Sequence, residues 1–259
     1  MRQDLLPPDV REILEERPKP LEAEIHDPPS THFRLAAGYL DLDNGWHRDF
    51  VVRELTGRDE EALGKVTKVG SMMIEILQRG LVSVGPYKSP EIADGLVAGD
   101  WETVLLAIRV VTFGETADFA PTCRSCARSY EVTVHLLDDI AKTELTEPSD
   151  LHFTVEGRHG TMYHLMLPLG STQRKMLQAT DLSVAEQNTM LLVDCIERVG
   201  DRPSLGKETV LNMPLADRRE VLRQVIERRP GPRLQEVTTV CPSCGAENNL
   251  PLSIAALFQ

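Results

Sequence analysis

The stretch Thr122-Cys-Arg-Ser-Cys-Ala127 has a counterpart in Val240-Cys-Pro-Ser-Cys-Gly245, at an offset of 118 residues (241 − 123). In each stretch two residues separate the two cysteines, a spacing with which a tight turn can present two thiolates to one metal ion. A tetrahedral zinc site needs four such ligands, and the two turns, or knuckles, together supply them. The sequence therefore predicts one structural zinc ion per chain, bound by Cys123, Cys126, Cys241 and Cys244.

The two knuckles are not equally strong as signals. Gly245 after the second pair allows the sharp exit that a knuckle makes, whereas Ala127 stands in that place after the first pair. The first pair is therefore the weaker one. The 114 residues between Cys126 and Cys241 also far exceed the loop of an ordinary zinc ribbon. Equivalent knuckles in two packed repeats would explain that separation.

Three other interpretations of the cysteines stay open at this point. A disulfide within a pair would suit an oxidising compartment. A thioredoxin-type redox dithiol would lie at the start of a helix, but strand-like sequence follows each pair here. The knuckles could also be degenerate and bind no metal. Cys195 lies in an apolar helical stretch and is interpreted as a buried core thiol.

Other segments recur in the same order as the knuckles. One β-hairpin is predicted over residues 33–42 and 46–55, and a second over 151–156 and 161–167. Each is followed by amphipathic helical sequence, predicted over 59–82 in the first copy and over 171–178 and 183–199 in the second.

A further helix is predicted in each copy, beginning at an aspartate. Asp100 and Asp217 are predicted to be N-caps. Gly114 and Gly231 each follow their aspartate by 14 residues (114 − 100 and 231 − 217) and are predicted to end these helices. A CxxC pair and a short strand come next in both copies. The pattern therefore predicts an α+β fold of two similar halves, each a β-hairpin plus helices and a knuckle strand, joined by one four-cysteine zinc site.

This pattern predicts that the chain is divided into three parts. Residues 1–30 are predicted to form an extended proline-rich arm, with room for at most one short helix at 9–16. Residues 31–145 form the first hairpin–helix–knuckle repeat and residues 146–259 the second.

The charge balance and the hydropathy bound the function. With 28 Lys and Arg against 40 Asp and Glu, the net charge is −12, which argues against a nucleic-acid-binding surface. A local basic patch around residues 218–229 is interpreted as a solvated helix face. The sequence shows no apolar run long enough to span a membrane and no signal-peptide core, so a cytoplasmic location is expected.

We find no sequence pattern that indicates catalysis. HExxH, GxSxG, the phosphate-binding GxxxxGK[ST] and GxGxxG are all missing from the chain, and the seven histidines are scattered. The expectation is therefore a protein that is not an enzyme, with no catalytic residues, no cofactor-binding residues other than the zinc ligands, and no small-molecule substrate.

Three segments carry a family resemblance: VRELTGRDEE at 52–61, VLLAIRVVTFG at 104–114 and CPSCG at 241–245. In this order the chain resembles, over residues 33–259, the baseplate or tail-assembly proteins of contractile phage tails and related injection systems. The resemblance implies a non-enzymatic structural subunit or assembly factor in the particle baseplate, with other baseplate and tail proteins as partners. Ala127 and the arm depart from it.

The runner-up is a zinc-ribbon adaptor that binds nucleic acid or the transcription machinery, which would need a basic face. A thiol oxidoreductase is a third possibility, and it would need a cysteine with a depressed pKa.

Overall fold

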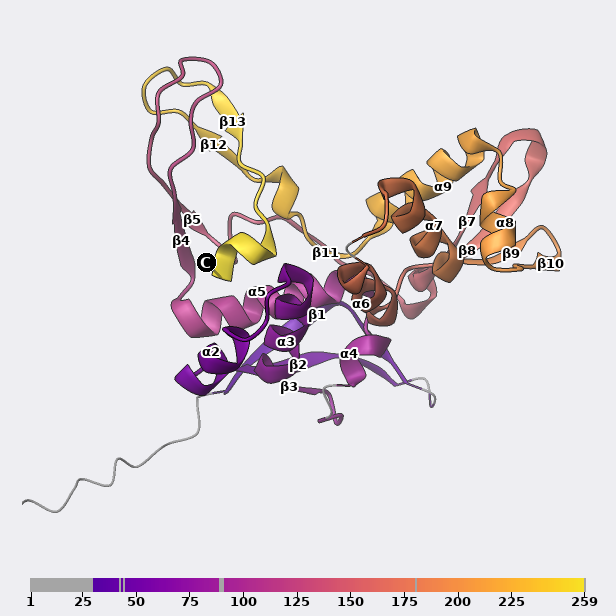
Figure 1. Ribbon diagram of the computed structural model, residues 1–259, viewed down its shortest axis with the longest axis horizontal. Helices are drawn as coiled ribbons and strands as arrows, with labels where there is room; N and C mark the ends of the chain where they lie inside the picture. The colour runs from indigo at the N-terminus through magenta and orange to yellow at the C-terminus, as the bar shows by residue number, and fades with distance from the viewer. Residues whose placement is uncertain (1–29, 42, 44, 89–90, 180, 259) are drawn as a thin grey trace, which may run out of the picture.

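A computed structural model describes residues 30–41, 43, 45–88, 91–179 and 181–258. Figure 1 shows two lobes side by side and a long projection that rises from the first. The predicted arm over 1–30, with its short helix at 9–16, lies outside the described residues except for residue 30, where the first strand begins. None of the helices in the described part of the chain is long and apolar enough to cross a membrane.

The first lobe is a three-stranded antiparallel sheet covered by helices. Its strands are β1 (Ser30–Leu40), β2 (Trp46–Arg53) and β3 (Leu81–Val84), in the order β1-β2-β3. Its helices are α2 (Gly57–Leu63), α3 (Val69–Gly80), α4 (Ile92–Gly95) and α5 (Ala98–Phe113). The long helix α5 packs on β1 and β2, and its Trp101 is buried in the core together with Phe50 and Leu35.

The prediction of one continuous helix over 59–82 is wrong. Residues 64–68 break it into α2 and α3, at a stretch that contains Gly64 and the β-branched Val66 and Thr67, all poor helix formers. Its last residues belong to β3, because the buried Leu81 and Val84 lie beside β2. The first hairpin, by contrast, is confirmed.

The second lobe has a four-stranded sheet and its own core. The strands are β7 (His152–Glu156), β8 (Met162–Met166), β9 (Ile196–Val199) and β10 (Arg202–Pro203), in the order β10-β9-β8-β7. The helices are α6 (Gly170–Gln178), α7 (Val184–Cys195), α8 (Lys207–Leu211) and α9 (Leu215–Arg228), and two 3₁₀ turns, η2 (Pro148–Leu151) and η3 (Arg158–Gly160), flank β7.

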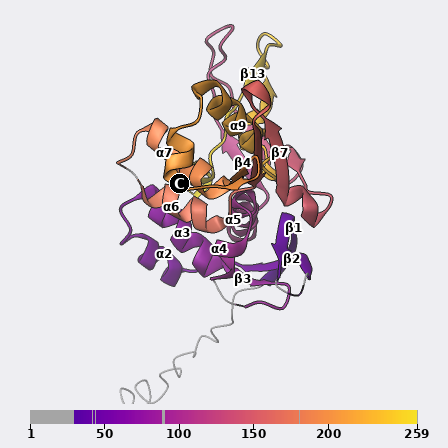
Figure 2. The ribbon, with the colours of Figure 1, turned by 90° about the vertical axis from the view of Figure 1, so that its right-hand side faces the viewer.

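The second hairpin is confirmed to within a residue, but the helix predicted over 183–199 ends at Cys195. Residues 196–199 instead form β9, because Ile196 is buried next to Leu165 of β8. Figure 2 shows β1, β2 and β7 on one side of the molecule and α2, α6 and α7 on the other.

The projection consists of two short antiparallel strand pairs that lie side by side (Figure 1). One pair is β4 (Thr116–Phe119) with β5 (Val132–His135), and the other is β12 (Thr238–Val240) with β13 (Glu247–Asn249). At the base, β6 (Lys142–Thr143) pairs with β11 (Gly231–Pro232), followed by the 3₁₀ turns η4 (Leu234–Glu236) and η5 (Ile254–Phe258).

The C-terminal segment returns to the first lobe. Leu234, Leu252 and Leu257 are part of the same buried cluster as Trp101. The guanidinium of Arg109 in α5 donates to the carbonyl of Leu257 at 2.7 Å and also to the carbonyls of Gly114 and Thr116. Residues from both ends of the chain therefore share one core.

The predicted N-cap roles of Asp100 and Asp217 are wrong. Val97 and Pro214 precede the helices, and each aspartate is the third helical residue and buried. Asp100 accepts the backbone N–H groups of Ala36, Ala37 and Gly38, at 2.8, 3.0 and 2.8 Å. Asp217 likewise accepts the N–H of Arg158 and the hydroxyl of Tyr163. Each carboxylate thus connects its helix to a hairpin.

Gly114 and Gly231, which were both predicted to end a helix, differ in their position relative to that helix. Gly114, at φ 93°, ends α5 as predicted. Helix α9 already ends at Arg228, ahead of Pro230, which cannot supply a helical N–H, so Gly231 lies in β11 instead.

The elements of the two lobes follow one another in the same order. In each, a hairpin is followed by two helices, then by a strand that pairs with the second hairpin strand, then by a short and a long helix. A knuckle hairpin follows each long helix. The fold is a mixture of helices and several small sheets, as predicted.

The lobes meet where α5 and α6 begin. Val97 and Leu169 form an antiparallel bridge, with the N–H of Gly170 donating to the carbonyl of Leu96 at 2.6 Å. A Cβ at Gly170 would lie 2.0 Å from the carbonyl oxygen of Ala93. The junction therefore requires glycine at this position.

Candidate metal centre

The four predicted cysteines lie together at the far end of the projection. Their sulfur atoms are all within 4.8 Å of one another. The Sγ atoms of Cys123 and Cys244 are 3.7 Å apart, and those of Cys126 and Cys241 are 3.8 Å apart. A tetrahedral zinc ion with bonds of about 2.3 Å to sulfur holds its ligands about 3.8 Å apart. The spacing thus fits a zinc ion and is far longer than a disulfide bond of about 2.05 Å.

The two knuckles have the same backbone geometry. In the first, the N–H of Cys123 donates to the carbonyl of Arg128 and the N–H of Ala127 donates to the carbonyl of Cys123, both at 2.9 Å. In the second, Cys241 with Ala246 and Gly245 with Cys241 make the same two bonds, also at 2.9 Å. Ala127 takes the turn conformation of a glycine, so its presence has not changed the shape of the first knuckle.

Asn248 of β13 connects the two hairpins. Its buried side chain donates to the sulfur of Cys123 at 3.6 Å and to the carbonyl of Ala246 at 3.0 Å, and it accepts the N–H of Arg124 at 3.0 Å. Nearby, the hydroxyls of Tyr130 and Thr239 are 2.6 Å apart. Such contacts fix the orientation of a metal ligand.

Sequence reasoning missed Asn248. The signal was available in residues 247–249, where two adjacent asparagines occupy a strand position although asparagine is depleted in strands.

The thiols at the site differ in acidity. The backbone N–H of Cys126, followed by that of Ser125 and the amide of Asn248, lowers the pKa of Cys123 to about 6. For Cys244 the N–H of Ala246 favours the thiolate, but burial and the sulfurs of Cys126, Cys123 and Cys241 together raise the pKa to about 11. The neighbouring sulfurs thus oppose the ionisation of Cys244, and a divalent cation among the four sulfurs would remove that opposition.

The donor set fits a structural ion and not a catalytic one. All four positions of a tetrahedral ion would be filled by thiolates, which leaves none for water or substrate. Each CxxC pair lies in a loop between two strands, without the helix that a redox dithiol requires. Among the described residues, no other group of three or more His, Cys, Asp or Glu side chains could hold a metal ion.

Cys195 is not part of this site. Its side chain is buried in the core of the second lobe, as predicted, and burial raises the pKa of the thiol to about 12.

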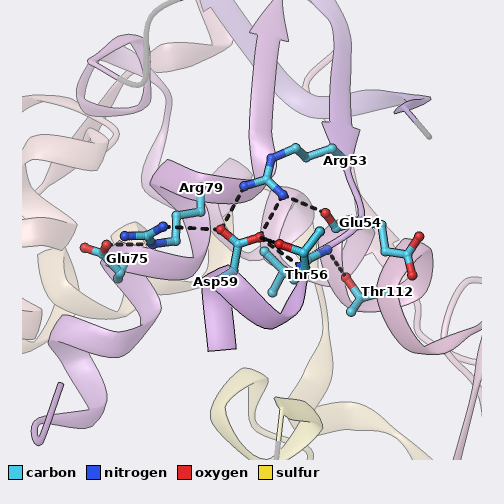
Figure 3. A network of polar contacts seen from close by, with 8 residues as sticks. Arg53, Glu54, Thr56, Asp59, Glu75, Arg79 and Thr112 are labelled. Carbon is cyan, nitrogen blue, oxygen red and sulfur yellow. Dashed lines mark hydrogen bonds and ion pairs between the residues drawn. The ribbon is translucent and has the colours of Figure 1, made fainter. Parts of the chain in front are cut away.

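The segment at 52–61 forms a polar network in the first lobe (Figure 3). Both guanidinium Nη atoms of Arg53 donate to the carboxylate of Asp59, at 2.8 and 2.9 Å, and Arg79 of α3 adds a contact at 3.3 Å. Hydrogen bonds from Arg53 hold the pKa of the Asp59 carboxyl well below its usual range. The N–H of Leu55 donates to the hydroxyl of Thr112, which joins this segment to 104–114. The network pins β2, α2, α3 and α5 to one another.

A family model described as T4 bacteriophage base plate protein matches residues 44–259 of the chain. Neither the curated proteins nor the solved structures gave a match. The matched residues include all four cysteines and the network around Asp59.

Proposed function

The chain belongs to the T4 bacteriophage base plate protein family, and we propose that it is a structural subunit or an assembly factor of the baseplate of a contractile phage tail or phage-like injection system. The family match over residues 44–259 carries this proposal. Its partners are then other baseplate and tail proteins. The protein is present in the cytoplasm during assembly and in the baseplate of the particle, and it acts by contact without catalysis.

A single zinc ion, bound by Cys123, Cys126, Cys241 and Cys244, stabilises the projection in this proposal. The spacing of the four sulfurs supports it. So does the small size of the local core, because the cluster at the tip consists of the buried Cys123, Tyr130 and Cys241 with the partly buried Cys126, Val132 and Ala246 packed against them. A cluster this small does not offset the cost of ordering two hairpins, and in small units of this kind a metal ion supplies the missing stability.

The halves 31–145 and 146–259 are, in this proposal, repeats of one unit. The order of elements, the equivalent knuckles and the two buried aspartates support that interpretation. A polar contact at equivalent positions of the two halves supports it further, with the carboxylate on the first helix in one half and on the second helix in the other. Asp59, the third residue of α2, contacts Arg79 near the end of α3, whereas Thr172, the third residue of α6, donates to Asp194 near the end of α7.

The described residues give no support to the alternative role, a zinc-ribbon adaptor that binds nucleic acid or the transcription machinery. Three arginines of the basic patch are engaged within the chain: Arg218 donates to Ala185 and Thr189, Arg223 pairs with Glu220 and Glu227, and Arg229 pairs with Glu102.

Removal of the gene from the phage or injection-system cluster tests the proposed role. We expect tubes and sheaths without a complete baseplate in electron micrographs, and restoration when the intact chain is supplied in trans. The Cys241→Ser/Cys244→Ser variant should restore assembly poorly, and the Cys195→Ala variant should restore it well. Complete, infectious or contractile particles from the deletion strain would refute the role.

A further inference from the structure

Most sheet edges in the two lobes are closed by a contact or by proline. In β1 the N–H groups of residues 36–38 are taken by Asp100, and the carbonyl of Ala36 accepts the N–H of Leu145. Strand β3 is covered at Val84 by a bridge to Tyr87. Strand β10 has two residues and ends in Pro203. These are the devices by which proteins protect an edge from pairing with another chain.

The outer edge of β7 is not closed in this way. The N–H of Leu167 donates to the carbonyl of Leu151, and the N–H of Gly157 donates to the carbonyl of Thr161. Since the groups of an antiparallel ladder alternate, residues 151, 153, 155 and 157 pair with β8, and residues 152, 154 and 156 direct their backbone groups outward. Among the described residues, the outward N–H groups of Thr154 and Glu156 have no hydrogen-bond partner.

The surroundings of β7 are accessible. The side chains of His152, Thr154 and Glu156 are exposed. Figure 2 shows β7 at the rim of the molecule, on the side opposite helix α7. The strand contains no proline and no lysine, and the charged residue exposed on it is Glu156.

The exposed residues of β7 are complementary to themselves in the antiparallel direction. If two copies of the strand lie antiparallel about Thr154, each His152 is placed opposite the Glu156 of the other copy. The Nδ1 of His152 already contacts Glu197 at 3.1 Å within the chain, which leaves Nε2 for the second copy. A hydrogen bond between this imidazole nitrogen and the facing carboxylate stabilises the strand pair, and like charges at facing positions oppose it.

We propose that β7 is an interaction surface for a second copy of this chain, which pairs with it through the same strand about a two-fold axis at Thr154. The pairing is isologous, as in most homodimers. Each Thr154 N–H donates to the Thr154 carbonyl of the other copy, and each Glu156 N–H donates to the His152 carbonyl. The two sheets join into one, with the exposed side chains of β7 on the same face.

A strand of five residues buries little surface, so this contact is weak in solution. In an assembly that places several copies side by side, the same contact acts at a high effective concentration and becomes significant. The proposal goes beyond the baseplate role and does not depend on the zinc ion.

Sedimentation velocity of the full chain over a concentration series tests it. We expect the wild type to dimerise with a dissociation constant below about 1 mM. Thr154→Pro removes the outward N–H without loss of a bond to β8, so it should be folded by circular dichroism and remain monomeric. His152→Glu places glutamates opposite each other and should weaken the dimer about tenfold, and the added change Glu156→Lys should restore it.

The matched control is His135→Glu, which makes the same change of charge on an exposed residue of β5. It should dimerise like the wild type. A wild type that stays monomeric to about 1 mM would overturn the proposal. So would a folded Thr154→Pro variant that dimerises as the wild type does. If Thr154→Pro does not fold, failure of Glu156→Lys to restore the His152→Glu dimer overturns it.

Discussion

Ala127 and Gly245 hold the same left-handed backbone conformation, at φ 57° and φ 71°, each directly after the second cysteine of its knuckle. A residue with a Cβ is disfavoured there by about 1 kcal/mol or more. The chain keeps the geometry of the first knuckle in spite of that cost. The first CxxC pair is therefore as well shaped as the second, although its sequence is the less typical one.

Two single substitutions, one in each knuckle, measure the backbone strain at these positions. Ala127→Gly should raise the free energy of unfolding by about 1 kcal/mol, because the same conformation becomes unstrained. Gly245→Ala should lower it by a similar amount, since a Cβ at Gly245 would meet no atom within 4 Å and only the backbone strain remains. Chemical denaturation of the zinc-loaded protein measures both. A loss of stability in Ala127→Gly would contradict the assignment.

Asp100 should dominate the stability of the first lobe among single polar residues. Asp100→Asn replaces one of the two acceptor oxygens by an NH2 group, which then faces at least one of the three backbone donors, and should cost about 3 kcal/mol. The measurement is urea denaturation, and Asp118→Asn on the exposed side of β4 is the control, since Asp118 bonds only the Thr133 hydroxyl. A loss below about 1 kcal/mol would show that the carboxylate is not needed at this contact.

The pH dependence of stability follows from two carboxyl groups with opposite shifts. Burial raises the pKa of Asp100 to about 6 in spite of its backbone donors, so the pH-dependent part of its contribution is fully present below pH 4 and declines as pH rises through 6. The pKa of Asp59 is depressed, so its contribution is present above pH 4 and is lost as pH falls further. Denaturation at a series of pH values should show that Asp59→Asn flattens the acid side and Asp100→Asn flattens the range from about 4 to 6.

If Asp59→Asn and Asp100→Asn both kept the wild-type dependence of stability on pH, these two carboxyl groups would not cause that dependence. Glu131→Gln, at an exposed position, serves as the control for the loss of one carboxyl group.

Arg109 should decide whether the C-terminal turn stays docked. Its guanidinium donates to the carbonyls of Leu257, Gly114 and Thr116, so Arg109→Ala leaves three acceptors without a charged donor and should cost about 3 kcal/mol. Limited proteolysis should then cut first near residues 254–258. The exposed Arg223→Ala is the control and should be cut at the wild-type rate. Equal rates for the two variants would refute the role of Arg109.

Gly170 tests the junction between the lobes, and Gly57 provides its control. Both are the first residue of a helix, but a Cβ would clash with Ala93 and Trp101 at Gly170 and meet nothing within 4 Å at Gly57. Gly170→Ala should cost about 3 kcal/mol, and Gly57→Ala should be close to neutral. Thermal denaturation compares them. Equal effects would contradict the close approach of α4 and α6.

Much of this structure could be predicted from short-range patterns in the sequence. The hairpins and the helix positions follow from the spacing of apolar residues, and the knuckles follow from the CxxC pairs. The break at 64–68 and the strands β3 and β9 were missed, because a strand that directly continues a helix carries no separate turn signal.

Long-range contacts could not be predicted in the same way. The aspartates at 100 and 217 look like N-caps in the sequence, but tertiary contacts with the hairpins decide their role. The return of residues 234–257 to the core around Trp101 depends on the packing of the whole chain. Asn248 matters only because the other knuckle lies against it.

The decisive experiment for the metal centre is to determine the zinc content of the purified full chain by elemental analysis, after preparation under reducing conditions without chelators. We expect about one zinc per chain in the wild type and in Cys195→Ala. We expect almost none in Cys123→Ser/Cys126→Ser and in Cys241→Ser/Cys244→Ser, because each pair supplies only half of a tetrahedral site. A wild-type content near zero, or a full zinc ion retained after either pair is replaced, would contradict the four-cysteine zinc site.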